Sequence, residues 1–142
     1  MANALFDPGR EGILDDTISW TVGVMKAALV RSYTFSAAHK FVSDVTTAGG
    51  VLVATSAALA SKTATSGVAN ASNVTWSAVA SGASTAAIII FQSSAVTGGS
   101  DVAATLQRVI AFIDTATGLP VTPNGGDITV AWDSGSNKIF KL

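Results

Sequence analysis

Two segments of the chain are apolar on both of their alternating faces, and they constrain the fold more than any other feature. In residues 22–30, one alternating set holds Met25, Ala27 and Leu29, and the other set is apolar except for Lys26. Residues 86–91 are apolar throughout and include three consecutive isoleucines. A strand with one side in solvent alternates apolar with polar residues, whereas a strand buried on both sides does not. The pattern therefore predicts two central strands that are covered on both faces.

Further short strands are expected along the rest of the chain. They fall at residues 51–54, 73–79, 108–114, 127–132 and 138–142, and turn-forming Gly, Asn, Asp and Ser separate them. A helical turn is expected at 37–45, with Ser36 as its N-cap. About seven or eight strands without strand–helix–strand alternation predict an all-β fold. We expect an antiparallel β-sandwich, or a jelly-roll-like body.

Residues 1–16 are expected to form a short N-terminal helix or arm ahead of a single β-sandwich domain at 17–142. Asp7 is placed to accept hydrogen bonds from the first free N–H groups of this helix. Pro8 suits the first helical position because its φ is preset. Gly9 and Gly12 weaken a helix, so this one is expected to form only when it packs against another element.

The chain carries few of the side chains that catalysis uses. Its 142 residues include no cysteine, one histidine (His39) and one glutamate (Glu11), and only 12% of the residues are charged. No Gly-x-Ser-x-Gly motif accompanies His39, so a hydrolase is the least supported function. We therefore expect a protein that is not an enzyme and that needs no cofactor or metal. Aspartates at strand ends leave a calcium site open as an alternative, although EF-hand spacing is absent.

Charge and hydropathy bear on the kind of partner. A net charge of −1 offers no basic field for nucleic acid or for an anionic membrane, so neither is expected as a partner. The longest apolar run falls far short of the ~20 residues that span a bilayer, and residues 1–12 lack the pattern of a secretion signal. A near-zero net charge with a mean hydropathy of +0.49 favours permanent association with other subunits.

Three tryptophans are candidates for a binding platform. Trp20, Trp76 and Trp132 could stack on a sugar or a base, but each lies among apolar neighbours. Core packing is therefore their expected role.

Both ends of the chain carry distinctive sequence blocks. Residues 1–14 read MANALFDPGREGIL and are followed by KAALV at 26–30. Residues 117–133 read TGLPVTPNGGDITVAWD, and NKIFKL follows at 137–142. This arrangement resembles small virion structural proteins of tailed bacteriophages, and most of all capsid cement (decoration) proteins. The resemblance implies a protein that is made in the host cytoplasm and sits on the capsid surface. It would bind the major capsid protein, form a dimer or trimer and clamp neighbouring shell subunits.

The candidate subunit-contact residues are large apolar groups near the two chain ends, where a monomer is usually polar and loose. They are Leu5, Phe6, Ile13, Leu14, Ile139, Phe140 and Leu142. We expect at least one terminus to pack on another copy or on the shell protein. The alternative function is a phage tail or host-attachment module that binds a glycan. Such a module needs a groove lined by aromatic residues, with Asp and Asn on loops.

Overall fold

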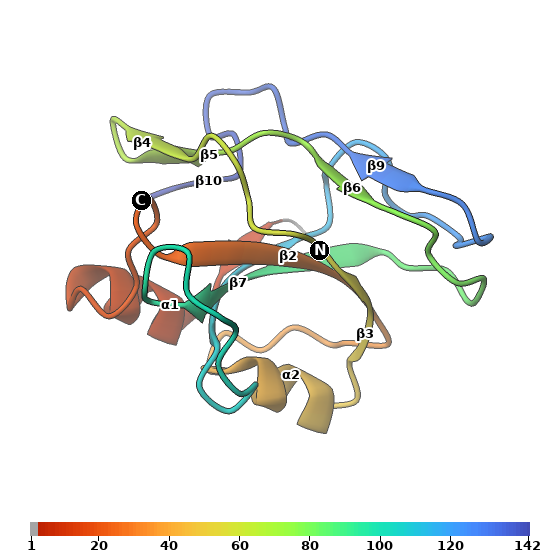
Figure 1. The fold of residues 1–142 in the computed structure, drawn as a ribbon, viewed down its shortest axis with the longest axis horizontal. Coiled ribbons are helices and arrows are strands. Elements are labelled where there is room, and N and C mark those ends of the chain that lie inside the picture. Colours follow the sequence, from red (N-terminus) through yellow and green to blue (C-terminus); the bar gives the residue numbers. More distant parts are fainter. Residues whose placement is uncertain (1–2) are drawn as a thin grey trace.

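A computed structural model describes residues 3–142, and it confirms the expected all-β, sandwich-like fold (Figure 1). Two short helices accompany ten strands in the described residues. The helices are α1 (Asp7–Leu14) and α2 (Val42–Thr47). The strands are β1 (Ala4–Leu5), β2 (Val24–Arg31), β3 (Val51–Thr55), β4 (Thr63–Thr65), β5 (Val68–Asn70), β6 (Val74–Trp76), β7 (Ala87–Ser94), β8 (Arg108–Ile113), β9 (Ile128–Val130) and β10 (Phe140–Lys141).

The largest sheet has five antiparallel strands in the order β1-β8-β7-β2-β3. Strand β7 lies at its centre, and all eight of its residues are buried. Strand β2 lies next to it, with Ala28 opposite Ile89. The two segments that are apolar on both faces are therefore interior strands, as their sequences predict.

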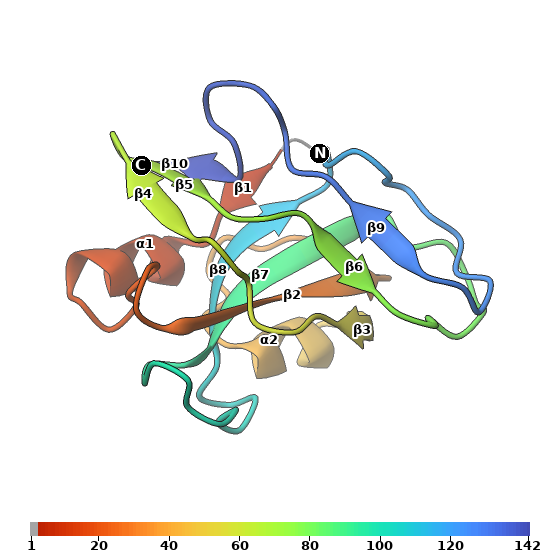
Figure 2. The same cartoon turned by 45° about the horizontal axis from the view of Figure 1, so that its top comes forward.

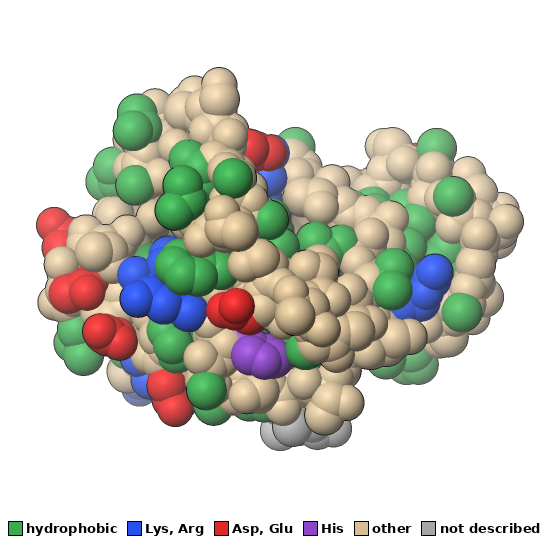
Figure 3. Space-filling model, turned by 90° about the horizontal axis from the view of Figure 1, so that it is seen from below, with side chains coloured by type: hydrophobic (Ala, Val, Ile, Leu, Met, Phe, Trp, Pro, Cys, Tyr) green, Lys and Arg blue, Asp and Glu red, His purple; other side chains and the backbone are tan. Residues whose placement is uncertain are grey.

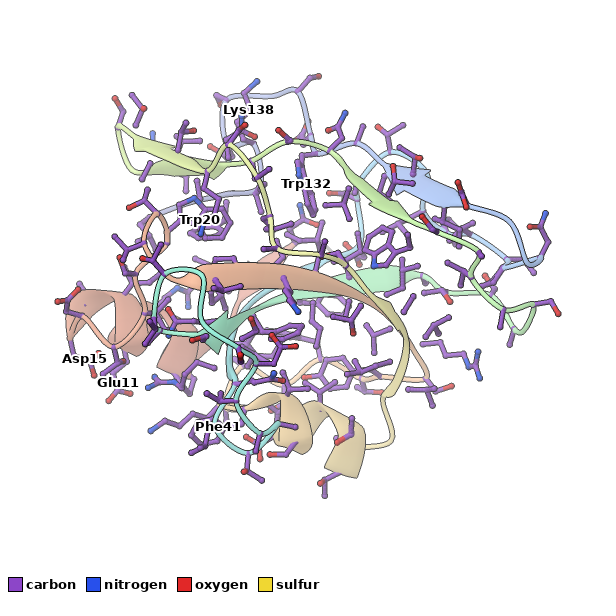
Figure 4. All side chains as sticks on the ribbon, viewed as in Figure 1. Glu11, Asp15, Trp20, Phe41, Trp132 and Lys138 are labelled. Atoms are coloured by element: carbon purple, nitrogen blue, oxygen red, sulfur yellow. The ribbon has the colours of Figure 1, made fainter. Side chains whose placement is uncertain are left out.

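Two smaller sheets, β10-β5-β4 and β6-β9, form a second layer over one face of the large sheet (Figures 1 and 2). Met25, Leu29 and Ile90 of the large sheet pack in the core between these layers. All three tryptophans are buried in this core, as expected, and Figure 4 places Trp20 and Trp132 between the layers.

The opposite face of the large sheet is covered by α2 and by the segment that precedes it. Ala28, Val30 and Ile89 point to this side and pack with Val42 and Val45 of the helix. Alternate residues of β2 and β7 thus enter two separate cores, which explains why both strands are apolar on both faces.

The N-terminal segment is part of the large sheet rather than a free arm. Strand β1 pairs with β8, and α1 packs against the same strand. This contact confirms that α1 forms against another element. Phe6, and not Asp7, is the N-cap of α1, and no side chain caps the helix. Asp7 instead binds Arg10 at 2.8 Å on the surface.

Two further details differ from expectation. Helix α2 begins at Val42, because the Asp44 carboxylate accepts hydrogen bonds from the backbone just before it, and Ser36 is not its N-cap. No strand is expected between residues 55 and 72, yet this stretch contains the β4–β5 hairpin. Its turn residues Ser66 and Gly67 both have positive φ, which is the geometry of a tight hairpin turn.

Candidate protein-binding surface

The structure separates the seven candidate contact residues into buried and exposed groups. Leu5, Phe6, Ile139 and Phe140 are all less than 9% exposed, so they stabilise the chain's own cores. As candidate contacts, these four do not lie on the surface of the chain, because β1 pairs with β8 and β10 pairs with β5. Sequence spacing cannot reveal such pairings between distant segments.

The other three candidates remain partly or fully accessible. Ile13 is partly buried against the core between the layers. Leu14 is 87% exposed at the end of α1, and Leu142 is 56% exposed. These two leucines come from opposite ends of the chain.

The two exposed leucines line one hollow of about 290 Å³, together with Leu5, Arg10 and Lys141. We call it the terminal hollow. Its walls are mainly apolar, and the two cationic side chains are its only charged side chains. Helix α1 supplies Arg10 and Leu14, whereas β10 and the residue after it supply Lys141 and Leu142. An apolar side chain from another protein would find both hydrophobic contact and a positive rim here.

A second hollow of about 250 Å³ adjoins the first and shares Leu5, Arg10 and Lys141 with it. It also contains residues of β1, of β10 and of the turn that carries Asp133 and Lys138. Figure 2 shows β1 and β10 close to each other at this end of the molecule. We call the two hollows together the terminal groove.

The charged side chains of the terminal groove are mostly basic. Arg10 forms an exposed ion pair with Asp7, and such pairs contribute little and are easily exchanged. The Lys138 ammonium donates to the Ser134 carbonyl at 3.2 Å, and Figure 4 places this lysine on the outer loop. With Lys141, three basic side chains therefore line the groove, and Asp133 is the one acidic side chain among its lining residues.

The titratable groups elsewhere do not gather into one site. Tyr33 Oη lies 2.7 Å from His39 Nδ1, and burial raises the pKa of Tyr33. Hydrogen bonds from two backbone N–H groups lower the pKa of Asp44. Burial lowers the pKa of Lys62, whose ammonium donates to the carbonyl of Gly23. Among residues 3–142, no group of three or more His, Asp or Glu side chains is placed to hold a metal ion.

Figure 3 views the molecule from the α2 side. Acidic and basic side chains are intermixed at the left of this face, near its single histidine, and do not form a basic patch there. A nucleic-acid backbone would need such a patch.

An aromatic groove of about 350 Å³ lies on the large sheet, apart from the terminal groove. Tyr33, Phe35 and Phe112 line it, with Arg31 and Ser84 among its polar residues. The Phe35 and Phe112 ring centroids are 5.4 Å apart, so these rings pack on each other as well as lining the groove. Sequence reasoning missed this groove, because its walls come from three separate segments of the chain.

No protein-family model matches the chain, and comparisons with curated proteins and with solved structures find no match either. No relative therefore assigns a role to the terminal groove or to the aromatic groove. Within residues 3–142, no helix is both long enough and apolar enough to cross a membrane.

Proposed function

We propose that this chain is a structural protein of a phage virion that binds the outside of the capsid and clamps neighbouring major capsid subunits. The observation that carries the proposal is the meeting of Leu14 and Leu142, from opposite ends of the chain, around one apolar hollow. The resemblance of both chain ends to capsid cement proteins is the second line of support.

The energetics of the terminal hollow favour a permanent partner. Burying a leucine side chain stabilises a complex by roughly 1.5–3 kcal/mol relative to leaving it exposed. A protein that binds only the assembled shell also stabilises that assembled state by mass action. In this proposal, the terminal hollow covers an apolar side chain of a capsid subunit, and the chain acts as a dimer or trimer on the shell.

The test uses capsids that lack the chain, prepared from the phage that encodes it. Wild-type protein and the double variant Leu14→Asp/Leu142→Asp are added, and occupancy is measured by co-sedimentation and by cryo-EM density. Both side chains are exposed, so the variant is expected to fold, which circular dichroism checks. The two aspartates remove both leucine contacts, each worth roughly 1.5–3 kcal/mol, so we expect the variant's occupancy to fall by about tenfold or more.

The matched control is Val51→Asp/Val96→Asp, which places the same two charges on residues that are 41% and 68% exposed and lie outside the groove. Its occupancy should equal that of the wild type. Equal occupancy of the double variant and the control would reject the terminal hollow as the capsid contact.

The aromatic groove favours a second function, that of a host-attachment module that binds a glycan. Aromatic rings with nearby polar groups suit the apolar faces and hydroxyls of sugars. A glycan array probed with wild type and with Arg31→Ala distinguishes this function. If the wild type binds a sugar that the Arg31→Ala variant does not bind, and the wild type does not bind capsids, the glycan-binding function is favoured over the capsid role.

A further inference from the structure

Two sheet edges meet at the terminal groove. Strand β1 is the last strand of the five-stranded sheet, and β10 is the last strand of the three-stranded sheet. Among residues 3–142, β1 pairs with β8 alone and β10 with β5 alone. Residues of both strands line the same hollow.

The strand registers show which backbone groups face outward from β1. Phe6 N–H donates to the Ile110 carbonyl at 3.0 Å, and Leu5 lies opposite Ala111. In antiparallel pairing, hydrogen-bonded and non-hydrogen-bonded positions alternate along the strand. The N–H and C=O groups of Leu5 therefore point away from β8.

The same alternation applies to β10. Leu142 N–H donates to the Gly67 carbonyl at 3.0 Å, and Lys141 lies opposite Val68. The N–H and C=O groups of Lys141 therefore point away from β5. Leu5 and Lys141 are two of the three residues that both hollows share, so the outward backbone groups lie where the groove is continuous.

We propose that the terminal groove binds an extended segment of the partner protein, which adds a strand against β1 or β10. Strand addition takes its affinity from main-chain hydrogen bonds and its specificity from pockets for alternate side chains. The terminal hollow is such a pocket and takes an apolar side chain. Arg10, Lys138 and Lys141 select a carboxylate on the same segment.

A helix fits these features less well than an extended chain. The backbone groups of a helix are already paired within it, so it would cover Leu5 and Lys141 without satisfying their N–H and C=O groups. This inference rests on the proposed function only for the identity of the partner, which would be the major capsid protein. The backbone groups and side chains that would recognise the segment belong to the groove and do not depend on which protein supplies the segment.

The test selects short peptides from a random display library on immobilised wild-type protein. Peptides that also bind the immobilised Leu14→Asp/Leu142→Asp variant are discarded, because they bind outside the terminal hollow. Selected peptides are synthesised, and their dissociation constants are measured by fluorescence anisotropy. We expect sequences that alternate apolar with other residues and that carry a carboxylate. Arg10→Glu and Lys141→Glu should weaken their binding by about tenfold, whereas Val51→Asp should not.

Methylation of single peptide nitrogens tests the strand geometry. Each N-methyl group removes one backbone donor, so loss of affinity should follow a period of two along the peptide. Failure to select any peptide, or losses without that period, would overturn strand addition. If the free protein forms concentration-dependent dimers and the Leu14→Asp/Leu142→Asp variant does not, the groove is occupied by a second copy of the chain. That result also overturns the inference.

The two proposals can fail separately. If capsid occupancy depends on the terminal hollow but peptides do not bind as strands, the capsid role is retained and the extended partner segment is rejected. Strand-like peptide binding without any effect of the double variant on capsid occupancy would retain the groove and reject the capsid role.

Discussion

Gly9 lies where α1 approaches β8, and its lack of a side chain permits that approach. A Cβ atom at this position would lie 2.8 Å from the Val109 carbonyl oxygen and 3.0 Å from Ile110 Cα. Alanine favours a helix over glycine by roughly 0.8–1 kcal/mol. Forcing an extra carbon into a packed site costs about 1–3 kcal/mol. The atoms in the way belong to the backbone of β8, which cannot rotate away as a side chain can. The steric cost should therefore exceed the gain in helix propensity.

We therefore expect Gly9→Ala to lower the free energy of unfolding by about 1 kcal/mol or more, measured by urea denaturation. Gly126→Ala is the matched control, because a Cβ there would meet only the Asn124 side chain, at 3.1 Å. A Gly9→Ala variant more stable than the wild type would show that helix propensity outweighs the contact.

Asp44 fixes the start of α2 through its charge. Its carboxylate accepts hydrogen bonds from the N–H groups of Phe41 and Lys40, each at 2.9 Å. These two bonds lower the pKa of Asp44 in the folded protein. A group whose pKa is lower when folded adds stability above its unfolded pKa, and this stability is lost as pH falls through the folded value.

Asp44→Ala should then lower the free energy of unfolding by about 1 kcal/mol at neutral pH. The difference from the wild type should shrink as pH falls below about 4, where the carboxyl begins to be protonated in the unfolded chain. Urea titrations at several pH values measure this difference. A difference that stays constant down to the acid end of the series would mean that packing, and not charge, makes Asp44 important.

At the scale of elements, the N-terminal segment has a structural side and an accessible side. Phe6 is fully buried against the second core, with its ring centroid 5.0 Å from that of Phe35, whereas Leu14 is 87% exposed. Phe6→Ala should lower the free energy of unfolding by about 3–5 kcal/mol. Leu14→Ala should change it by less than about 0.5 kcal/mol.

Thermal or urea unfolding of the two variants measures this contrast, and Leu14→Ala serves as the control for Phe6→Ala. Similar losses for both would mean that the exposed end of α1 is also needed for folding. The same contrast explains why point variants at Leu14 and Leu142, rather than deletions of the termini, are suitable tests of function.

The elements that the sequence predicts well are those with strong local signals. Strands β2 and β7 stand out because long apolar residues occupy both faces, and α1 stands out because Pro8 opens it. The β4–β5 hairpin lacks such a signal. Its strands hold small residues, and β4 is exposed along its whole length. Its turn places Ser66 at positive φ, and a serine gives no sequence signal for that conformation.

The candidate site was only partly predictable for a different reason. Leu14 and Leu142 are recognisable as apolar groups near the chain ends, but their meeting depends on pairing between distant strands. The same pairing buries Leu5 and Phe140, which look equivalent to them in the sequence. Exposure of a terminal apolar residue is therefore a property of the whole topology and not of the terminal segment.

At the scale of the whole molecule, residues 3–142 form one well-paired sheet and two short ones, so the stability should be uneven. Strand β7 is bonded to β2 on one side and to β8 on the other, and all its residues are buried. Strands β6 and β9 pair with each other over three residues, and Thr75 and Thr129 at their centre are exposed. Local opening follows the burial and pairing of each element.

Native-state hydrogen exchange should therefore find two levels of protection. We expect the β7 amides to exchange only through global unfolding, with a strong dependence on denaturant. The β6 and β9 amides should exchange through a smaller opening that depends weakly on denaturant. The edge strands give an internal control, because Phe6 and Leu142 donate backbone hydrogen bonds whereas the N–H groups of Leu5 and Lys141 point outward. Slow exchange at those two outward amides in the free protein would contradict the open groove, and equal protection in β6, β9 and β7 would contradict the uneven stability.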